Sequence, residues 1–120
     1  MIVLIIDDDV DERLILSEAF CELDPSIILQ TASRCEHGLP LLACDPLPDL
    51  ILLDDTMPMQ SGMDCLRQIR ADERLQNVRI VMYSTFHQEN VKELRDLNAD
   101  FLVKHSDYME LKEALKKLIR

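Results

Sequence analysis

Two groups of neighbouring aspartates are the first residues in the chain that could carry out chemistry. Asp7, Asp8 and Asp9 follow one apolar run, and the stretch DLILLDDTMP places Asp54 and Asp55 directly after another. Carboxylates that lie close together repel one another unless a cation or a positively charged side chain is near. Oxygen ligands of this kind favour magnesium, which binds a few carboxylates and keeps some of its waters. If the fold brings the two groups together, the sequence predicts a Mg²⁺ site.

Two further side chains at the ends of apolar runs would suit a phosphoryl group. Ser84 follows VMY and Lys104 follows FLV, and phosphoryl oxygens need hydrogen-bond donors and positive charge. A carboxylate attacks a phosphoryl dianion poorly unless charge is neutralised, and Mg²⁺ and Lys104 would both do this. Each feature alone has a plainer explanation. Asp8 or Asp9 could cap a helix, and a single Lys or Ser after a strand is usually a solvated loop residue.

The pattern of apolar residues predicts the elements that carry these side chains. Short apolar runs predict five strands, at residues 2–6, 27–29, 50–53, 78–83 and 101–103. Apolar residues at helical spacing predict helices at residues 10–23, 63–69, 91–97 and 108–119. Another helix is expected between residues 33 and 47, although Gly38 and Pro40 disfavour its first part.

Strands that alternate with helices predict an α/β fold, here a single doubly wound, five-stranded parallel sheet with helices on both faces. Ligands of such sheets bind beyond the carboxyl ends of the strands. Both groups of aspartates, Ser84 and Lys104 stand at such ends, so we expect them to meet at one site. At 120 residues the chain has the size of one domain, which would span residues 1–120.

The charge balance and the start of the chain limit the possible partners. With 13 basic and 23 acidic residues the net charge is −10, which argues against direct binding of nucleic acid or of an anionic membrane surface. The apolar start MIVLII lacks a basic segment and meets three aspartates at once, so it does not predict a signal peptide. No apolar run approaches the length of a membrane span. We therefore expect a cytoplasmic protein.

Four cysteines are spread along the chain: Cys21, Cys35, Cys44 and Cys65. None belongs to a C-x-x-C pair, so their spacing argues against a zinc site. In a reducing cytosol we expect free, mostly packed thiols.

Taken in order, these motifs resemble the receiver domain of two-component response regulators, which has a flavodoxin-like fold. VLIIDDD resembles the opening acidic strand of the family. PDLILLDDTMPMQSG resembles the phosphorylation-site signature, with Met57, Pro58 and Gly62 at the family's offsets from Asp54. IVMYST resembles the strand that carries the switch hydroxyl, and ADFLVK resembles the strand that carries the lysine. The resemblance covers essentially the whole chain.

The resemblance implies that Asp54, not Asp55, accepts the phosphoryl group. It also implies that Mg²⁺ is held by Asp7, Asp8, Asp54 and the backbone carbonyl of Thr56. In that pattern Asp8 is a direct ligand, whereas Asp7 acts partly through water.

The resemblance further implies roles for residues on the fourth and fifth predicted strands. Lys104 and Ser84 would bind the phosphoryl oxygens, and Ser84 would act with the aromatic ring of Phe101 in switching. Thr85 and Phe86 differ from the small or polar residues common at these positions and would modulate the site. We expect the Phe86 ring to exclude water and to slow hydrolysis of the phosphoaspartate.

The function implied by the resemblance is that of a signalling switch. Asp54 would take a phosphoryl group from a histidine kinase or a histidine phosphotransfer protein, with Mg²⁺ as the cofactor. The phosphorylated form would alter binding to a downstream protein, or to an output domain if the chain is part of a longer one. Self-catalysed transfer and slow hydrolysis would give the domain modest enzymatic character.

Other classes of function fit the residues less well. A pseudo-receiver would keep the fold and bind a protein without being phosphorylated, but the complete set of acidic, hydroxyl and lysine residues argues against it. A phosphatase of the haloacid dehalogenase type needs a second aspartate two residues after the nucleophile, or Gly-Thr soon after it, whereas this chain has Thr56 followed by Met-Pro. Nucleotide-binding α/β folds need glycine-rich loops, and this chain has only Gly38 and Gly62.

One departure from the family pattern lies beside the lysine, where His105 replaces the usual proline. A cis peptide bond costs ~3–4 kcal/mol before other residues, but only ~0.5–1 kcal/mol before proline. We therefore predict a trans bond between Lys104 and His105. The flexible stem of Lys104 would still allow its ammonium to reach Asp54.

Overall fold

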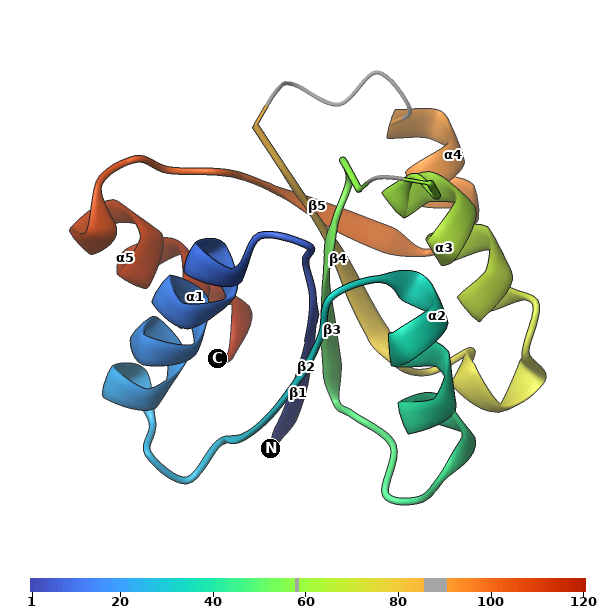
Figure 1. The fold of residues 1–120 in the computed structure, drawn as a ribbon, viewed down its shortest axis with the longest axis horizontal. Coiled ribbons are helices and arrows are strands. Elements are labelled where there is room, and N and C mark those ends of the chain that lie inside the picture. The colour runs from blue at the N-terminus through green and yellow to red at the C-terminus, as the bar shows by residue number, and fades with distance from the viewer. Residues whose placement is uncertain (58, 86–90) are drawn as a thin grey trace.

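The computed structural model describes residues 1–57, 59–85 and 91–120, and this part of the chain contains one sheet of five parallel strands (Figure 1). The strands are β1 (Ile2–Ile6), β2 (Ile28–Ala32), β3 (Leu50–Asp54), β4 (Arg79–Ser84) and β5 (Ala99–Val103). The helices are α1 (Val10–Leu23), α2 (Cys35–Gly38), α3 (Gly62–Arg70), α4 (Val91–Asp96) and α5 (Tyr108–Leu118). The predicted fold class is confirmed.

Helices cover both faces of the sheet. Successive residues of a strand point to opposite faces, so Val3 and Ile5 of β1 pack with α1 and α5, whereas Leu4 and Ile6 pack with α2, α3 and α4. Figure 1 shows the same division, with α1 and α5 on one side of the sheet. Burial on both faces explains why β1 is a continuous apolar run. Within the described residues, no helix is both long and apolar enough to span a membrane.

The order of the strands, β2-β1-β3-β4-β5, brings two of the acidic strand ends together. β1 pairs with β2 on one side and with β3 on the other, so the direction in which successive strands are added reverses at this point. In doubly wound sheets such a reversal opens a crevice beyond the carboxyl ends of the two central strands. Asp7 follows β1 and Asp54 ends β3, which places both at this crevice.

Most element boundaries agree with the sequence pattern, and the clearest difference lies between β2 and β3. β2 runs to Ala32, beyond the predicted end. The helix expected after it is only the single turn α2, followed by a 3₁₀ helix, Leu39–Ala43, that contains Pro40 near its start. Proline lacks the backbone N–H that a continuing α-helix needs. Gly38 packs closely on β1, because an added Cβ would lie 2.7 Å from Ile6 Cδ1.

The prediction that all four cysteines are free is wrong for two of them. Cys35 of α2 and Cys65 of α3 form a disulfide, with their Cα atoms 5.8 Å apart. Both are buried on the face of the sheet that α2 and α3 cover. Cys21 and Cys44 are free, but they are exposed and not packed. The two paired residues are 30 positions apart, so only the tertiary packing of two helices reveals the pair.

Candidate functional site

Asp54 is a buried carboxylate at the end of the central strand β3. Its side chain is only 3 % exposed. Oδ1 accepts a hydrogen bond from Lys104 Nζ at 3.0 Å and another from the backbone N–H of Thr56 at 3.3 Å. Burial raises the pKa of the Asp54 carboxyl above its ordinary value, and the ammonium of Lys104 offsets part of this rise. Asp54 is therefore a buried acidic group held beside the ammonium of Lys104.

Two more carboxylates lie beside Asp54, as the strand order requires. Oxygens of Asp7, Asp8 and Asp54 all lie within 4.8 Å of one another. Asp7 is buried, whereas Asp8 is exposed. Burial, together with the charges of Asp54 and Glu12, raises the pKa of Asp7 to about 7, although the N–H of Asp9 acts in the opposite direction.

The three carboxylates fit the Mg²⁺ ion that the sequence implies. Asp7 Oδ1 accepts a hydrogen bond from the N–H of Asp9 at 2.9 Å. Asp7 Oδ2 is buried and has no hydrogen-bond partner among the described residues. A buried polar atom without a partner is costly, and a hard cation with oxygen ligands would satisfy it. Asp7, Asp8 and Asp54 are therefore suitable ligands for such an ion.

The third aspartate of the first group has a different task. Asp9 is the N-cap of α1, where its Oδ1 accepts hydrogen bonds from the N–H groups of Asp11 at 2.9 Å and Glu12 at 3.3 Å. The capping explanation thus holds for Asp9. Arg13, one turn into the same helix, donates from Nη1 to the carbonyl of Asp7 at 2.6 Å. Together these contacts fix the start of α1 against the end of β1.

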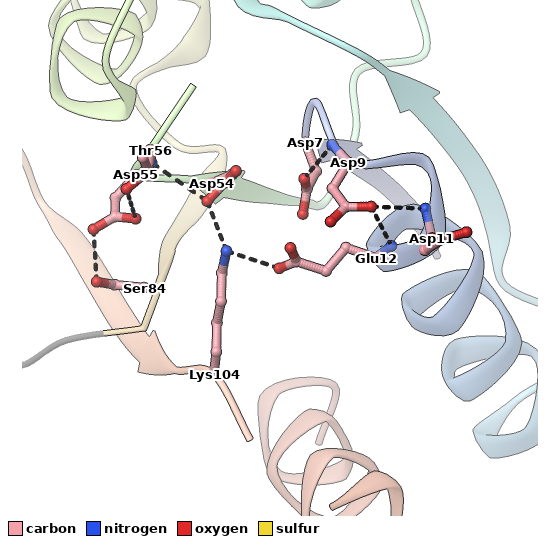
Figure 2. A network of polar contacts seen from close by, with 9 residues as sticks. All are labelled: Asp7, Asp9, Asp11, Glu12, Asp54, Asp55, Thr56, Ser84 and Lys104. Atoms are coloured by element: carbon pink, nitrogen blue, oxygen red, sulfur yellow. Dashed lines mark hydrogen bonds and ion pairs between the residues drawn. The ribbon is translucent and has the colours of Figure 1, made fainter. Parts of the chain in front are cut away.

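Lys104 follows β5 and reaches across the carboxyl ends of the strands to the acidic site (Figure 2). Its Nζ lies 3.0 Å from Asp54 Oδ1 and 2.8 Å from Glu12 Oε1. Burial lowers the pKa of the Lys104 ammonium, but the contacts with Glu12 and Asp54 outweigh this and raise it.

Asp45–Pro46 is the only cis peptide bond among the described residues, so the bond from Lys104 to His105 is trans, as predicted.

Ser84, buried at the end of β4, donates from Oγ to Asp55 Oδ2 at 2.6 Å. The other oxygen of that carboxylate, Oδ1, accepts a hydrogen bond from the hydroxyl of Thr56 at 3.0 Å. Figure 2 shows the carboxylates of Asp54 and Asp55 turned to different partners, Lys104 and Ser84. Ser84 therefore lies at the site, but its hydroxyl is hydrogen-bonded to Asp55 and not to the predicted acceptor, Asp54.

The remaining predicted site residues lie around this centre. Phe101 of β5 is 37 % exposed and borders a surface groove together with Val91 and Leu94 of α4. Thr85 is exposed, directly after β4. Phe86 lies outside the described residues.

Gly62, the glycine of the predicted phosphorylation-site signature, lets the start of α3 approach the end of β3 closely. An added Cβ at Gly62 would lie 2.4 Å from the carbonyl oxygen of Asp54, which no side chain could tolerate. The N–H of Gly62 donates to the carbonyl of Asp55 at 3.0 Å. Ser61 caps the same helix by accepting from the N–H of Asp64 at 3.2 Å. These contacts fix the backbone of the residues that follow Asp54.

Sequence reasoning did not assign a role to either Glu12 or Asp55. A glutamate in the first turn of a helix is ordinarily explained by the helix dipole, and nothing in the sequence shows that Glu12 points towards Lys104. Asp55 stands beside Asp54, to which the resemblance assigns the role of acceptor. A second carboxylate directly after Asp54 was the signal that could have drawn attention to it.

The chain as a whole matches one protein family. A model of the response regulator receiver domain matches residues 3–116. The chain belongs to this family. It is thus a receiver domain of a two-component response regulator. Receiver domains interact with histidine kinases or histidine phosphotransfer proteins, and they generally bind Mg²⁺ at an acidic pocket.

Relatives of the receiver domain differ in length. The chain is 27% identical to sporulation initiation phosphotransferase F of Bacillus subtilis, over 98% of the chain and 92% of that protein. It is 28% identical to the chemotaxis protein CheY of Listeria monocytogenes, over 95% of the chain and 94% of that protein. By contrast, it spans 48% of the positive alginate biosynthesis regulatory protein of Pseudomonas aeruginosa, with 35% identity.

Solved structures of response regulators share the fold. The phosphorylated cyanobacterial phytochrome response regulator RcpA has a TM-score of 0.86 and 22% identity, over 98% of this chain and 89% of that one. The response regulator RPA3017 in red light signaling of R. palustris has a TM-score of 0.80 and 28% identity, over 98% of this chain and 90% of that one.

Proposed function

We propose that this receiver domain is a switch in which Asp54 accepts a phosphoryl group from a histidine kinase or a histidine phosphotransfer protein, in a reaction that depends on Mg²⁺. One observation carries the proposal. The buried carboxylate of Asp54 lies beside both the Lys104 ammonium and a pair of carboxylates, Asp7 and Asp8. A cluster of this composition suits a phosphoryl group because it combines a nucleophile with a cation and a metal-binding set.

In the proposed transfer, an oxygen of Asp54 attacks the phosphorus atom of the donor phosphohistidine. The bond between phosphorus and the imidazole nitrogen breaks, and a mixed anhydride of carboxylate and phosphate forms. Lys104 neutralises negative charge on the phosphoryl oxygens throughout. Mg²⁺, when bound, neutralises further charge on these oxygens. The proposed ligands of the ion are Asp7, Asp8, Asp54 and the backbone carbonyl of Thr56.

Residues around Asp54 would control how long the phosphoaspartate lasts and how a protein partner recognises it. Ser84 donates its hydroxyl to a phosphoryl oxygen, and Phe101 changes position with it, which alters the surface offered to a protein partner. By the family pattern, Thr56 and Phe86 would flank the path of the water that hydrolyses the phosphoaspartate, and Thr85 would modulate the site. The large ring of Phe86 should make this hydrolysis slow.

The test is to incubate the protein with acetyl phosphate and Mg²⁺ and to measure intact mass. We expect a mass increase of one phosphoryl group in the wild type. The increase should be absent in Asp54→Asn and after addition of EDTA, and a comparison of circular dichroism spectra should show that the variant is folded. A folded wild-type protein that gains no phosphoryl group would contradict the proposal and leave the pseudo-receiver explanation.

A further inference from the structure

Both groups proposed to bind phosphoryl oxygens are held by carboxylates for which the sequence predicted no role in phosphorylation. Lys104 pairs with Glu12, and Ser84 donates to Asp55. Figure 2 shows the two contacts on either side of Asp54, with Glu12 reaching in from α1 and Asp55 lying next along the chain. Neither carboxylate belongs to the set of three that could bind a metal. Their positions therefore call for a separate explanation.

Glu12 competes with Asp54 for the ammonium of Lys104. The two contacts have similar lengths, 2.8 Å to Glu12 Oε1 and 3.0 Å to Asp54 Oδ1. The side chain of Lys104 is 18 % exposed and that of Glu12 is 26 % exposed, so solvent screens this pair less than a surface pair. While Glu12 stays paired with the ammonium, its negative charge offsets part of the positive charge that a phosphoryl group on Asp54 would use.

Asp55 similarly competes for the hydroxyl of Ser84. A serine hydroxyl has one hydrogen to donate, and in the structure it is directed to Asp55 Oδ2 at 2.6 Å. Hydrogen bonds to a carboxylate are shorter and stronger than neutral ones. The Asp55 carboxylate is also fixed by the hydroxyl of Thr56. Ser84 must give up this bond before it can donate to a phosphoryl oxygen.

We infer that Glu12 and Asp55 are positioning residues that hold Lys104 and Ser84 in the unphosphorylated arrangement and thereby oppose phosphorylation of Asp54. The inference rests on the proposed function of Asp54 as the acceptor. Both carboxylates act in the same direction, because each binds a donor that the phosphoryl group needs and each adds negative charge beside it. Glu12 and Asp55 thereby favour the unphosphorylated arrangement of the site over the phosphorylated one.

The experiment measures the rate of phosphorylation by acetyl phosphate in saturating Mg²⁺. In this reaction the bond between phosphorus and the acetate oxygen breaks, acetate leaves, and the bond to Asp54 forms. We expect Glu12→Gln and Asp55→Asn each to raise the rate by about threefold or more, on the scale of a partly exposed ion pair. Glu113→Gln, an exposed change of equal charge on α5, should leave the rate as in the wild type.

A second measurement distinguishes an effect of Asp55 through the Ser84 hydroxyl from a direct effect of its negative charge on the phosphoryl group. Asp55 is inferred to act through Ser84, so Asp55→Asn should have a much smaller effect in a Ser84→Ala background than in the wild type. An equal effect in both backgrounds would overturn the inference for Asp55. Rates for Glu12→Gln and Asp55→Asn at or below the wild-type rate would overturn it for both residues.

Affinity for beryllofluoride, which mimics a phosphoryl group without a covalent step, gives a further readout. It should rise in Glu12→Gln and Asp55→Asn alongside the rate, and an unchanged affinity would count against the inference. Failure of the wild type to be labelled at all would instead contradict the proposed function. The two failures are thus distinguishable.

Discussion

The adjacent carboxylates of Asp54 and Asp55 bind different partners on opposite sides of the chain. Asp54 accepts from Lys104 at 3.0 Å, whereas Asp55 accepts from Ser84 at 2.6 Å. Consecutive residues at a strand end direct their side chains in opposite directions, so only one of the pair can join the acidic cluster. Asp54 is that residue, because it lies within 4.8 Å of both Asp7 and Asp8.

This division predicts that the phosphoryl group is carried by Asp54 alone. Borohydride reduction converts a phosphorylated aspartate to homoserine, which peptide mass mapping can place on one residue. We expect homoserine at position 54, and Asp55→Asn should retain it there. Homoserine at position 55, or its loss in Asp55→Asn, would mean that the neighbour is the acceptor.

The metal-binding set predicts different results for two neighbouring aspartates. Asp8→Ala removes a proposed Mg²⁺ ligand and should lower the rate of labelling by acetyl phosphate by about 10-fold or more. Loss of a residue that only supports a metal ligand already costs about 10-fold. Asp9→Asn is the matched control, because asparagine caps a helix as well as aspartate does and Asp9 caps α1. Its labelling should stay near that of the wild type. Amide NMR shifts during a Mg²⁺ titration should show weaker binding only in Asp8→Ala.

The sequence predicted the fold well because its strongest signals are local. β1 and β3 are continuous apolar runs ended by aspartates, and a parallel sheet buries such runs on both faces. The strand ends then meet by topology. The short α2 was harder to predict, because Gly38 and Pro40 weaken a helix without showing what replaces it.

The contacts that sequence did not reveal depend on side-chain direction and tertiary packing. Glu12 could have pointed to solvent, and its contact with Lys104, the residue that follows β5, depends on the tertiary arrangement of the two segments. The pairing of Cys35 with Cys65 likewise depends on the packing of two helices. No local propensity encodes either contact.

Burial of Asp7 predicts that the stability of the Mg²⁺-free protein falls as pH rises from about 4 to 7. The pKa of Asp7 is raised from 3.8 to about 7 in the folded protein. Between these values the folded state keeps a proton that the unfolded chain has released, so this contribution is complete below pH 3.8 and is lost as pH rises through about 7. Urea unfolding in EDTA across this range should show the decrease.

The matched variant for this effect is Asp7→Asn, which keeps an oxygen to accept the N–H of Asp9 but cannot titrate. Its stability should change less with pH between 4 and 7, and the difference in slope from the wild type should reach about 1.4 kcal/mol per pH unit at most, the value for one proton. Curves that run parallel in the two proteins would show that Asp7 titrates normally.

The disulfide between Cys35 and Cys65 predicts a loss of stability on reduction. The bond closes a loop with a sequence separation of 30 residues, and a cross-link of this span stabilises a fold by about 2–4 kcal/mol, largely by restricting the unfolded chain. Urea unfolding with and without dithiothreitol should therefore give different midpoints. Thiol titration in guanidinium should find two reactive thiols before reduction and four afterwards, because Cys21 and Cys44 are free.

Substitution of the exposed cysteines provides the control. A Cys21→Ser, Cys44→Ser double variant should keep the wild-type midpoint and should keep its sensitivity to dithiothreitol. Cys35→Ala should abolish that sensitivity, although the cavity left in the core adds its own loss of stability. For this reason the decisive quantity is the effect of the reductant within each variant, and not the midpoint itself. Four reactive thiols in the unreduced wild type would show that the bond does not form.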